Sequence, residues 1–436
     1  MEVAHRLRRA VLIGTRRVDL TGKDPSVRVT TLFNILLNLQ GLWVVAFEFD
    51  GEDLVLHVRP RHRRLTCPCC GRSRPNSVPH SVRDRDWRHL GIWSRKVRIR
   101  GPVRRFHCLS CKGPVTESVP WARLGSSFTK PFENAVGLMA QRTDHTTVSQ
   151  LFDIAWKTVG SIAERLVDEL LDSNRFTNLR RIGVDEISFC KRHRYLTIVT
   201  DHDTGAVIWA GEGKCSDTLK GFFEGLESDV CEAIEIVTMD MSQAYKKAVR
   251  EALPSATIAF DHFHIAKLAN EALSEVRRAL ARDVRASDPE LAKEIKGKRW
   301  PMAYSLPNLP AKHLSDLASL KPGSPLARAY LLKEELLWTL RGGPAKTKEA
   351  LGEWLSWAAR SRLKPFIRLG RTIRDHLAGI HAFIDNQVTN ARAEGINNKV
   401  RLLSHRAFGF HSAGPLIATI YLCCGGLKVP GSLHLL

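Results

Sequence analysis

The stretch IEIVTMDMSQAYKKAVREALP, residues 234–254, places one aspartate between two segments of different periodicity. Residues 234–239 are mostly apolar and β-branched, which favours a buried strand. Residues 242–252 repeat apolar side chains at helical spacing, which predicts an amphipathic helix. Asp240 stands at the junction. A carboxylate there either caps the helix or meets a cation, because burying it unpaired costs several kcal/mol.

The surrounding chain continues this alternation and predicts a mixed α/β sheet. Asp185 lies within another short apolar segment, and an Asp-Thr-Gly turn at residues 203–205 separates two further strands. Residues 262–385 are mostly helical in pattern. The expected strands cover residues 182–189, 194–211 in two parts, 234–240 and 256–261, with a helix near 216–227.

The charge of the chain is strongly basic and unevenly distributed. Lys and Arg number 66 against 45 Asp and Glu, for a net charge of +21. Residues 59–112 contain 16 Lys or Arg and only two acids, Asp84 and Asp86. Such a segment attracts polyanions, so nucleic acid is the favoured partner over a merely solvated basic surface. No apolar run reaches the ~20 residues of a membrane span, and we expect no membrane association and a cytoplasmic protein with an uncleaved N-terminus.

Two Cys-x-x-Cys pairs lie in this basic segment, in a module expected to be β-rich. Residues 43–60 alternate apolar and polar side chains around Asp50-Gly51, which predicts a hairpin. Residues 95–108 suggest two strands around a Gly-Pro turn. The paired spacing predicts a structural zinc site, whereas disulfides or buried thiols are the alternatives that a cytosolic chain disfavours. The four predicted ligands are Cys67, Cys70, Cys108 and Cys111.

A short helical unit follows the β-rich module. Residues 146–166 show two runs of apolar side chains that fit two helices joined by a short turn. Any helical hairpin shares this pattern, but the basic module beside it favours helix-turn-helix DNA binding. The predicted inward positions are Val148, Leu151, Ile154, Val159, Ile162 and Leu166. The predicted DNA contacts are Lys157, Thr158, Ser161 and Arg165 on the second helix, with Arg63 and Arg64 from the basic module.

Glu394 is a third carboxylate of interest, in a polar and helical stretch far downstream of Asp185 and Asp240. Two aspartates on one sheet and a glutamate on a helix over it can hold a pair of Mg²⁺ or Mn²⁺ ions. Hard cations need oxygen ligands, which explains the residue types. Each carboxylate alone also has an ordinary explanation, as a helix cap for Asp240 or as a surface residue for Glu394.

These motifs together resemble the ISL3 family of bacterial insertion-sequence transposases, from about Val27 to Tyr421 and in the same order. The resemblance rests on GVDEISF, on VTMDMSQAYKKAVREALPSATIAFDHFHIAKLANEA and on NARAEGINNKVRLLSHRAFGFHS, preceded by CPCCG and CLSCKGP. The family resembles the wider DDE group, whose catalytic domain has a ribonuclease-H-like fold. The resemblance implies that Asp185, Asp240 and Glu394 are the catalytic metal ligands. The role of His264, within FDHFHI, stays open between the reaction site and the fold.

We therefore expect a multidomain α+β protein that is a DDE transposase. It would bind the terminal inverted repeats of its element and use Mg²⁺ to cleave and transfer DNA strands, as a homo-oligomer on double-stranded element ends and target DNA in the bacterial nucleoid. The alternatives are a non-catalytic DNA-binding regulator that uses only residues 1–172, or a nuclease or resolvase of similar fold. The expected regions are an N-terminal arm (1–30), a zinc-ribbon-like basic module (31–125), a helix-turn-helix (126–175) and a ribonuclease-H-like catalytic domain (176–425) with a helical insertion at about 265–385.

Overall fold

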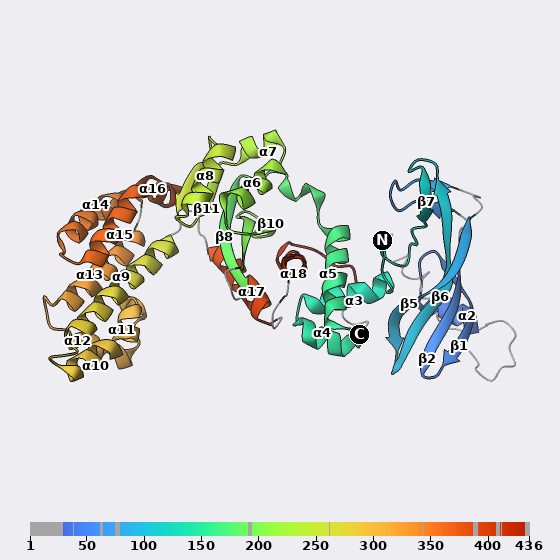
Figure 1. Cartoon of the computed structure of the whole chain (residues 1–436), viewed down its shortest axis with the longest axis horizontal. Coiled ribbons are helices and arrows are strands. Elements are labelled where there is room, and N and C mark those ends of the chain that lie inside the picture. Colours follow the sequence, from blue (N-terminus) through green and yellow to red (C-terminus); the bar gives the residue numbers. More distant parts are fainter. Residues whose placement is uncertain are drawn as a thin grey trace, which may run out of the picture. The chain divides into compact units, whose positions relative to one another are not determined.

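Figure 1 shows the computed structural model of the protein. It describes residues 29–37, 39–61, 64–74, 79–190, 194–260, 262–342, 344–386, 391–406, 410 and 412–431. These residues divide into two compact units. The first falls within Met1–Thr143, Gln150–Leu166 and Val429–Leu436, and the second within Asp144–Ser149 and Val167–Lys428. The predicted N-terminal arm lies outside the described residues, except for residues 29 and 30.

The first unit is built on a twisted sheet in the order β1-β2-β6-β5, with β7 added along β6 (Figure 1). The hairpin predicted at Asp50-Gly51 is confirmed, because β1 and β2 pair antiparallel and Gly51 has a φ of 61°. Trp87 and Trp121 meet edge to face in the core beneath the sheet. The elements are α2 (Val29–Leu37), β1 (Leu42–Asp50), β2 (Asp53–Pro60), β3 (Leu65–Thr66), β4 (Ser73–Arg74), β5 (Ser81–Ile92), β6 (Arg95–Cys108) and β7 (Gly113–Thr116).

The turn predicted at Gly101-Pro102 is wrong, because β6 runs without a break from Arg95 to Cys108. On one side β6 pairs with β5 throughout this region. On its other side β2 pairs only as far as Arg100, and β7 begins pairing at Arg105. Pro102 therefore lies where this side of β6 has no strand partner, so its missing N–H costs no hydrogen bond there. Gly101 fits because a Cβ would come within 2.7 Å of the Val58 side chain.

Three helices follow the sheet, namely α3 (Lys130–Ala140), α4 (His145–Phe152) and α5 (Trp156–Leu170). Val148, Val159, Ile162 and Leu166 are buried as predicted, but Leu151 is 62% exposed. Phe152 takes the buried place at the end of α4 and meets the ring of Phe132 edge to face. The helical face of α4 is thus defined by positions 148 and 152, which are four residues apart.

The second unit contains a five-stranded sheet in the order β10-β9-β8-β11-β12. β9 is antiparallel to both of its neighbours, whereas β8, β11 and β12 are parallel to one another. The mixed sheet predicted from the sequence is thereby confirmed. Its elements are η1 (Ser173–Phe176), β8 (Arg181–Cys190), β9 (Arg194–Asp201), β10 (Val207–Glu212), α6 (Ser216–Glu224), α7 (Ser228–Ala233), β11 (Ile236–Met239), α8 (Gln243–Ala252) and β12 (Thr257–Phe260).

A long helical segment follows β12 and shares one hydrophobic core with the sheet. Its first helix, α9, packs against α10, α13 and α15, while α16 packs on β12. Gly379 permits that approach, because a Cβ there would lie 2.4 Å from the ring of Phe260. The helices are α9 (His262–Asp283), α10 (Pro289–Gly297), α11 (Arg299–Ala303), η2 (Leu306–Asn308), η3 (Ala311–His313), α12 (Leu314–Ala318), α13 (Pro325–Leu340), α14 (Pro344–Arg360), α15 (Lys364–Asp375) and α16 (Leu377–Asn386).

Two final helices return to the sheet. α17 (Ala391–Arg406) packs against β8, and α18 (Ala413–Cys424) packs against β10 (Figure 1). The hydroxyl of Tyr421 on α18 accepts a hydrogen bond from the backbone N–H of Ala210 on β10 at 3.1 Å. Among the described residues, no helix is both long enough and apolar enough to cross a bilayer.

Candidate functional site

The four predicted cysteines meet in one cluster. The sulfurs of Cys67, Cys70, Cys108 and Cys111 all lie within 4.8 Å of one another. Two of the separations, Cys67 to Cys111 and Cys70 to Cys108, are 3.8 and 3.7 Å. A tetrahedral zinc site with Zn–S bonds of about 2.3 Å has sulfurs about 3.8 Å apart. The cluster therefore has the dimensions and the donor type of a structural Zn²⁺ site.

Each cysteine pair lies in a tight backbone turn. In the first, the N–H of Gly71 donates to the carbonyl of Cys67 at 3.0 Å, and Gly71 has a φ of 66°. In the second, Lys112 occupies the same left-handed region with a φ of 51°. Hydrogen bonds from the Cys70 backbone lower the pKa of Cys67 to about 6, whereas hydrogen bonding with Cys67 raises the pKa of Cys111. Four thiols at this distance cannot all ionise without a shared cation, which a bound zinc supplies.

Asp185 and Asp240 are neighbours in the second unit because of the register of two parallel strands. β8 and β11 pair with Val184 opposite Met239. Asp185 is the next residue on β8 and Asp240 directly follows the end of β11, so the two lie at adjacent positions. Burial raises the pKa of Asp185 to about 7, and the negative charge of Asp240 adds to that rise. Two oxygen ligands crowded in this way fit a divalent cation of the hard type.

Asp240 does not cap the helix that follows it. The N-cap of α8 is Ser242, whose hydroxyl accepts from the N–H of Tyr245 at 3.5 Å. The Asp240 carboxylate instead faces α9, where Nδ1 of His264 lies 3.3 Å from its Oδ2. Burial alone would raise the pKa of Asp240. The hydrogen bond and charge of His264, with the charges of Lys267 and Arg401, outweigh burial, so the pKa of Asp240 is lowered. The capping alternative is thereby removed for Asp240.

His264 therefore lies at the carboxylates, a position that the sequence left open. Lys267 is one turn further along α9, and its charge also acts on Asp240. The sequence shows that His264 and Lys267 are three residues apart, about one helical turn. It does not show which carboxylate this side of the helix faces. The partner of a ligating carboxylate commonly fixes its orientation.

Glu394 lies on α17, which packs against the strand of Asp185. Its side chain is outside the described part of the structure. The positive charge of Arg401, on the same helix, opposes the rise in the pKa of Asp185 and adds to the lowering of the pKa of Asp240. Seven residues are almost two helical turns, so positions 394 and 401 share one face about 10 Å apart along the axis. On that face, Arg401 is the described residue whose charge acts on the two aspartates.

The predicted DNA-contact residues fall into three groups. Lys157 and Ser161 are exposed on α5, with Thr158 half-buried beside them. Arg165 instead turns toward α3, where its Nη2 lies 2.5 Å from Oε1 of the fully buried Glu133. Arg64 is exposed in the basic module, and Arg63 lies outside the described residues.

Several other arginines of the basic module are already paired within the sheet. Arg100 binds Asp86 through two bonds of 2.8 and 2.9 Å. Arg104 binds the buried Glu117 at 2.6 Å. Part of the positive charge counted in the sequence therefore stabilises the sheet, and exposed residues such as Arg64 remain to meet a polyanion.

Three family models match the chain and together cover most of it. A model of the ISL3 family described as a transposase matches residues 182–420. A model described as the helix-turn-helix domain of transposase family ISL3 matches residues 117–167. A model described as the zinc finger of the IS204, IS1001, IS1096 and IS1165 transposases matches residues 63–111, which contain all four clustered cysteines.

Curated relatives give the same picture over nearly the full length. The transposase for insertion sequence element IS1557 of Mycobacterium tuberculosis is 35% identical over 437 residues, covering 93% of this chain and 98% of the relative. The transposase for IS1001 of Bordetella parapertussis is 28% identical over 367 residues, covering 83% of this chain and 89% of the relative.

Proposed function

The chain belongs to the ISL3 family of insertion-sequence transposases, and we propose that its Asp185, Asp240 and Glu394 form the reaction centre. It is a DNA-binding enzyme of the DDE type. A regulator limited to residues 1–172 would not need the segment matched at 182–420. The adjacency of Asp185 and Asp240 on parallel strands is the observation that carries the proposal.

The catalytic domain, on this proposal, has the ribonuclease-H-like fold that the family resemblance implies. A mixed five-stranded sheet in which only the second strand, β9, runs against the others supports it. The first carboxylate is on the central strand and the second follows the neighbouring parallel strand. Helices α9–α16 then form an insertion between that sheet and α17.

The three carboxylates would hold divalent cations, with Mg²⁺ as the expected ion. Such cations, when bound, activate a water or a 3′-hydroxyl and stabilise the leaving oxygen of a phosphodiester. Asp185 and Asp240 would bind through oxygens fixed by the sheet, and α17 would bring Glu394 over β8. His264 would hold the Asp240 carboxylate in one orientation. Lys267 and Arg401, whose positive charges act on Asp240, would attract the phosphate of a substrate strand.

Recognition of the terminal inverted repeats would fall to the first unit. Lys157, Thr158 and Ser161 on α5 would contact a groove of double-stranded DNA, and exposed arginines such as Arg64 would contact its phosphates; the exposure of Lys157, Ser161 and Arg64 supports this. Arg165 would act differently, since its ion pair with Glu133 ties α5 to α3. We further propose that the protein works as a homo-oligomer on the paired element ends and target DNA.

Strand cleavage of a duplex that contains one element end tests the reaction centre. Asp185→Asn and Asp240→Asn should each lower the rate in Mg²⁺ by about a thousandfold or more, because a lost ligand removes several kcal/mol of transition-state stabilisation. Asp203→Asn is the matched control. Asp203 is an exposed carboxylate in the β9–β10 turn and pairs with Arg181 at the start of β8. All three variants should stay folded and bind the duplex. Near-normal cleavage by folded Asp240→Asn would refute the assignment.

A further inference from the structure

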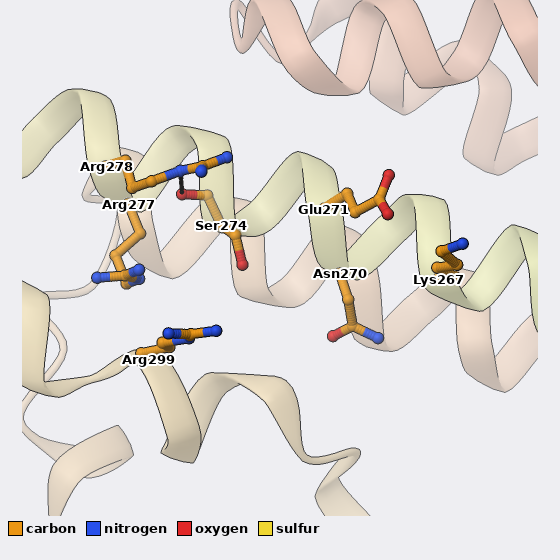
Figure 2. A pocket seen from close by; sticks show the side chains of 7 residues that line it. All are labelled: Lys267, Asn270, Glu271, Ser274, Arg277, Arg278 and Arg299. Atoms are coloured by element: carbon orange, nitrogen blue, oxygen red, sulfur yellow. Dashed lines mark hydrogen bonds between the residues drawn. The ribbon is translucent and has the colours of Figure 1, made fainter. Parts of the chain in front are cut away.

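Helix α9 has a basic cavity along the face that follows His264 and Lys267. The cavity has a volume of about 490 Å³ and lies between α9 and the start of α11. Figure 2 shows Lys267, Ser274, Arg277 and Arg278 arranged along α9, with Arg299 facing them from the second element. Glu271 is the one carboxylate among the residues that line it. The lining is therefore strongly positive.

The guanidinium groups in this cavity lack acidic partners. In the described part of the chain, neither Arg277, Arg278 nor Arg299 forms an ion pair with a carboxylate. Arg277 is 8% exposed and donates one hydrogen bond, to the carbonyl of Lys296 at 3.1 Å. Burial lowers the pKa of Arg277, and the like charges of Arg299 and Arg278 lower it further. Three crowded cations, none of them in an ion pair among the described residues, make a site for an anion.

Helix α9 links the cavity to the proposed reaction centre. Lys267 lines the cavity and its charge acts on Asp240, while His264, one turn earlier, contacts the Asp240 carboxylate. From Lys267 to Arg278 the helix rises about 16 Å at ~1.5 Å per residue. A DNA strand advances about 3.4 Å per nucleotide, so this face spans about five nucleotides.

We propose that this face of α9, with Arg299, binds the phosphate backbone of the DNA that adjoins the scissile bond. The helical insertion is then a DNA-binding element, separate from the end recognition of the first unit. The inference rests on the proposed reaction centre, because that centre fixes where the scissile phosphate lies. The ligand is a run of phosphodiesters, which the guanidinium groups neutralise without reading base sequence.

Equilibrium binding of the full-length protein to an end-containing duplex, measured without divalent cation, tests this. The double variant Arg278→Gln/Arg299→Gln removes two exposed charges and leaves the Arg277 hydrogen bond intact. The matched control is Arg360→Gln/Arg371→Gln, two exposed arginines of the same helical segment outside the cavity. We expect the cavity variant to raise Kd at least about tenfold and to reduce the salt slope by about 2, one per lost phosphate contact. The control should change both far less.

Methylphosphonate linkages, which remove single phosphate charges, locate the contact. Placed within about five nucleotides of the scissile bond, they should weaken binding by wild type but have little further effect on the cavity variant, since both changes remove the same interaction. Equal salt slopes for cavity and control variants would overturn the proposal, and so would methylphosphonate effects of the same size in wild type and cavity variant. A failure of the reaction centre appears separately, as wild-type protein that binds the duplex but does not cleave it in Mg²⁺.

Discussion

The cysteine cluster and the carboxylate pair are two ligand sets built in opposite ways. Each half of the cysteine cluster comes from a single tight turn, so Cys67 and Cys70 are placed by the few residues between them. Asp185 and Asp240 are 55 positions apart and meet only because β8 and β11 pair in one register. A bound zinc would tie the two turns of the first set together, whereas the second set is positioned by the hydrogen-bonded strands of a sheet.

This difference separates stability from activity. Removing a cysteine ligand should damage the fold of its module, while altering the carboxylate surroundings should change the reaction and leave the fold. The same kind of change at the two sites therefore has different consequences, and three predictions in decreasing order of effect test that contrast.

The largest effect is expected for Cys108→Ser. Structural zinc sites have apparent binding free energies of about 10–16 kcal/mol. Losing one thiolate should therefore release the ion and unfold the two cysteine turns. Elemental analysis and limited proteolysis of the first unit measure both results. Cys69→Ser is the matched control, because this exposed cysteine is outside the cluster. Equal zinc content in the two variants would show that Cys108 is not a zinc ligand, and the contrast between the two sites would fail.

His264→Ala should give an intermediate effect, confined to the reaction. Loss of a residue that orients a metal ligand typically costs 10–100-fold in metal affinity or activity. We expect cleavage to need more Mg²⁺ for half-maximal rate and to recover partly at high Mg²⁺, unlike in Asp240→Asn. His313→Ala is the matched control, since His313 makes a similar contact with Asp316 at 3.0 Å away from the site. If His264→Ala had the Mg²⁺ dependence of wild type, His264 would have no positioning role.

The smallest effects concern Gly71 and Lys112, the residues with left-handed backbone conformation in the two cysteine turns. Gly71→Ala should destabilise the zinc-bound unit by roughly 1–2 kcal/mol, through backbone strain alone, because a Cβ there would meet no atom within 4 Å. Lys112→Gly should stabilise it by up to about 1 kcal/mol, since it relieves the same strain at a φ of 51°. Denaturant unfolding of both variants measures the pair. Shifts of the same sign would show that the two turns are not equivalent.

Local patterns in the sequence were the ones that predicted structure well. The hairpin at Asp50-Gly51 and the four cysteines each needed only a few neighbouring residues. Gly101-Pro102 misled because the gap between β2 and β7 that accommodates Pro102 is made by distant strands. Leu151 was assigned to the buried side because the spacing of apolar residues in one helix gives their periodicity, but does not show which side of the helix faces the core.

Long-range partners were beyond the sequence pattern. The position of Arg165 on α5 suggested a DNA contact. Its guanidinium instead forms an ion pair with the buried Glu133, which lies on another helix. The contact between His264 and Asp240 likewise depends on how α9 leaves β12. The family resemblance supplied the three carboxylates, but it could not supply their neighbours Lys267 and Arg401, whose charges the fold brings to the site.

The parallel register of β8 and β11 has a consequence for how this enzyme can change during evolution. The separation of Asp185 and Asp240 is inherited from the spacing of hydrogen-bonded strands, about 4.8 Å, a constant of the polypeptide backbone. Residues in the loops between them can be inserted, deleted or replaced without altering that separation. A shift of one residue along β11 would do what no loop change does, because it would turn Asp240 to the opposite face of the sheet.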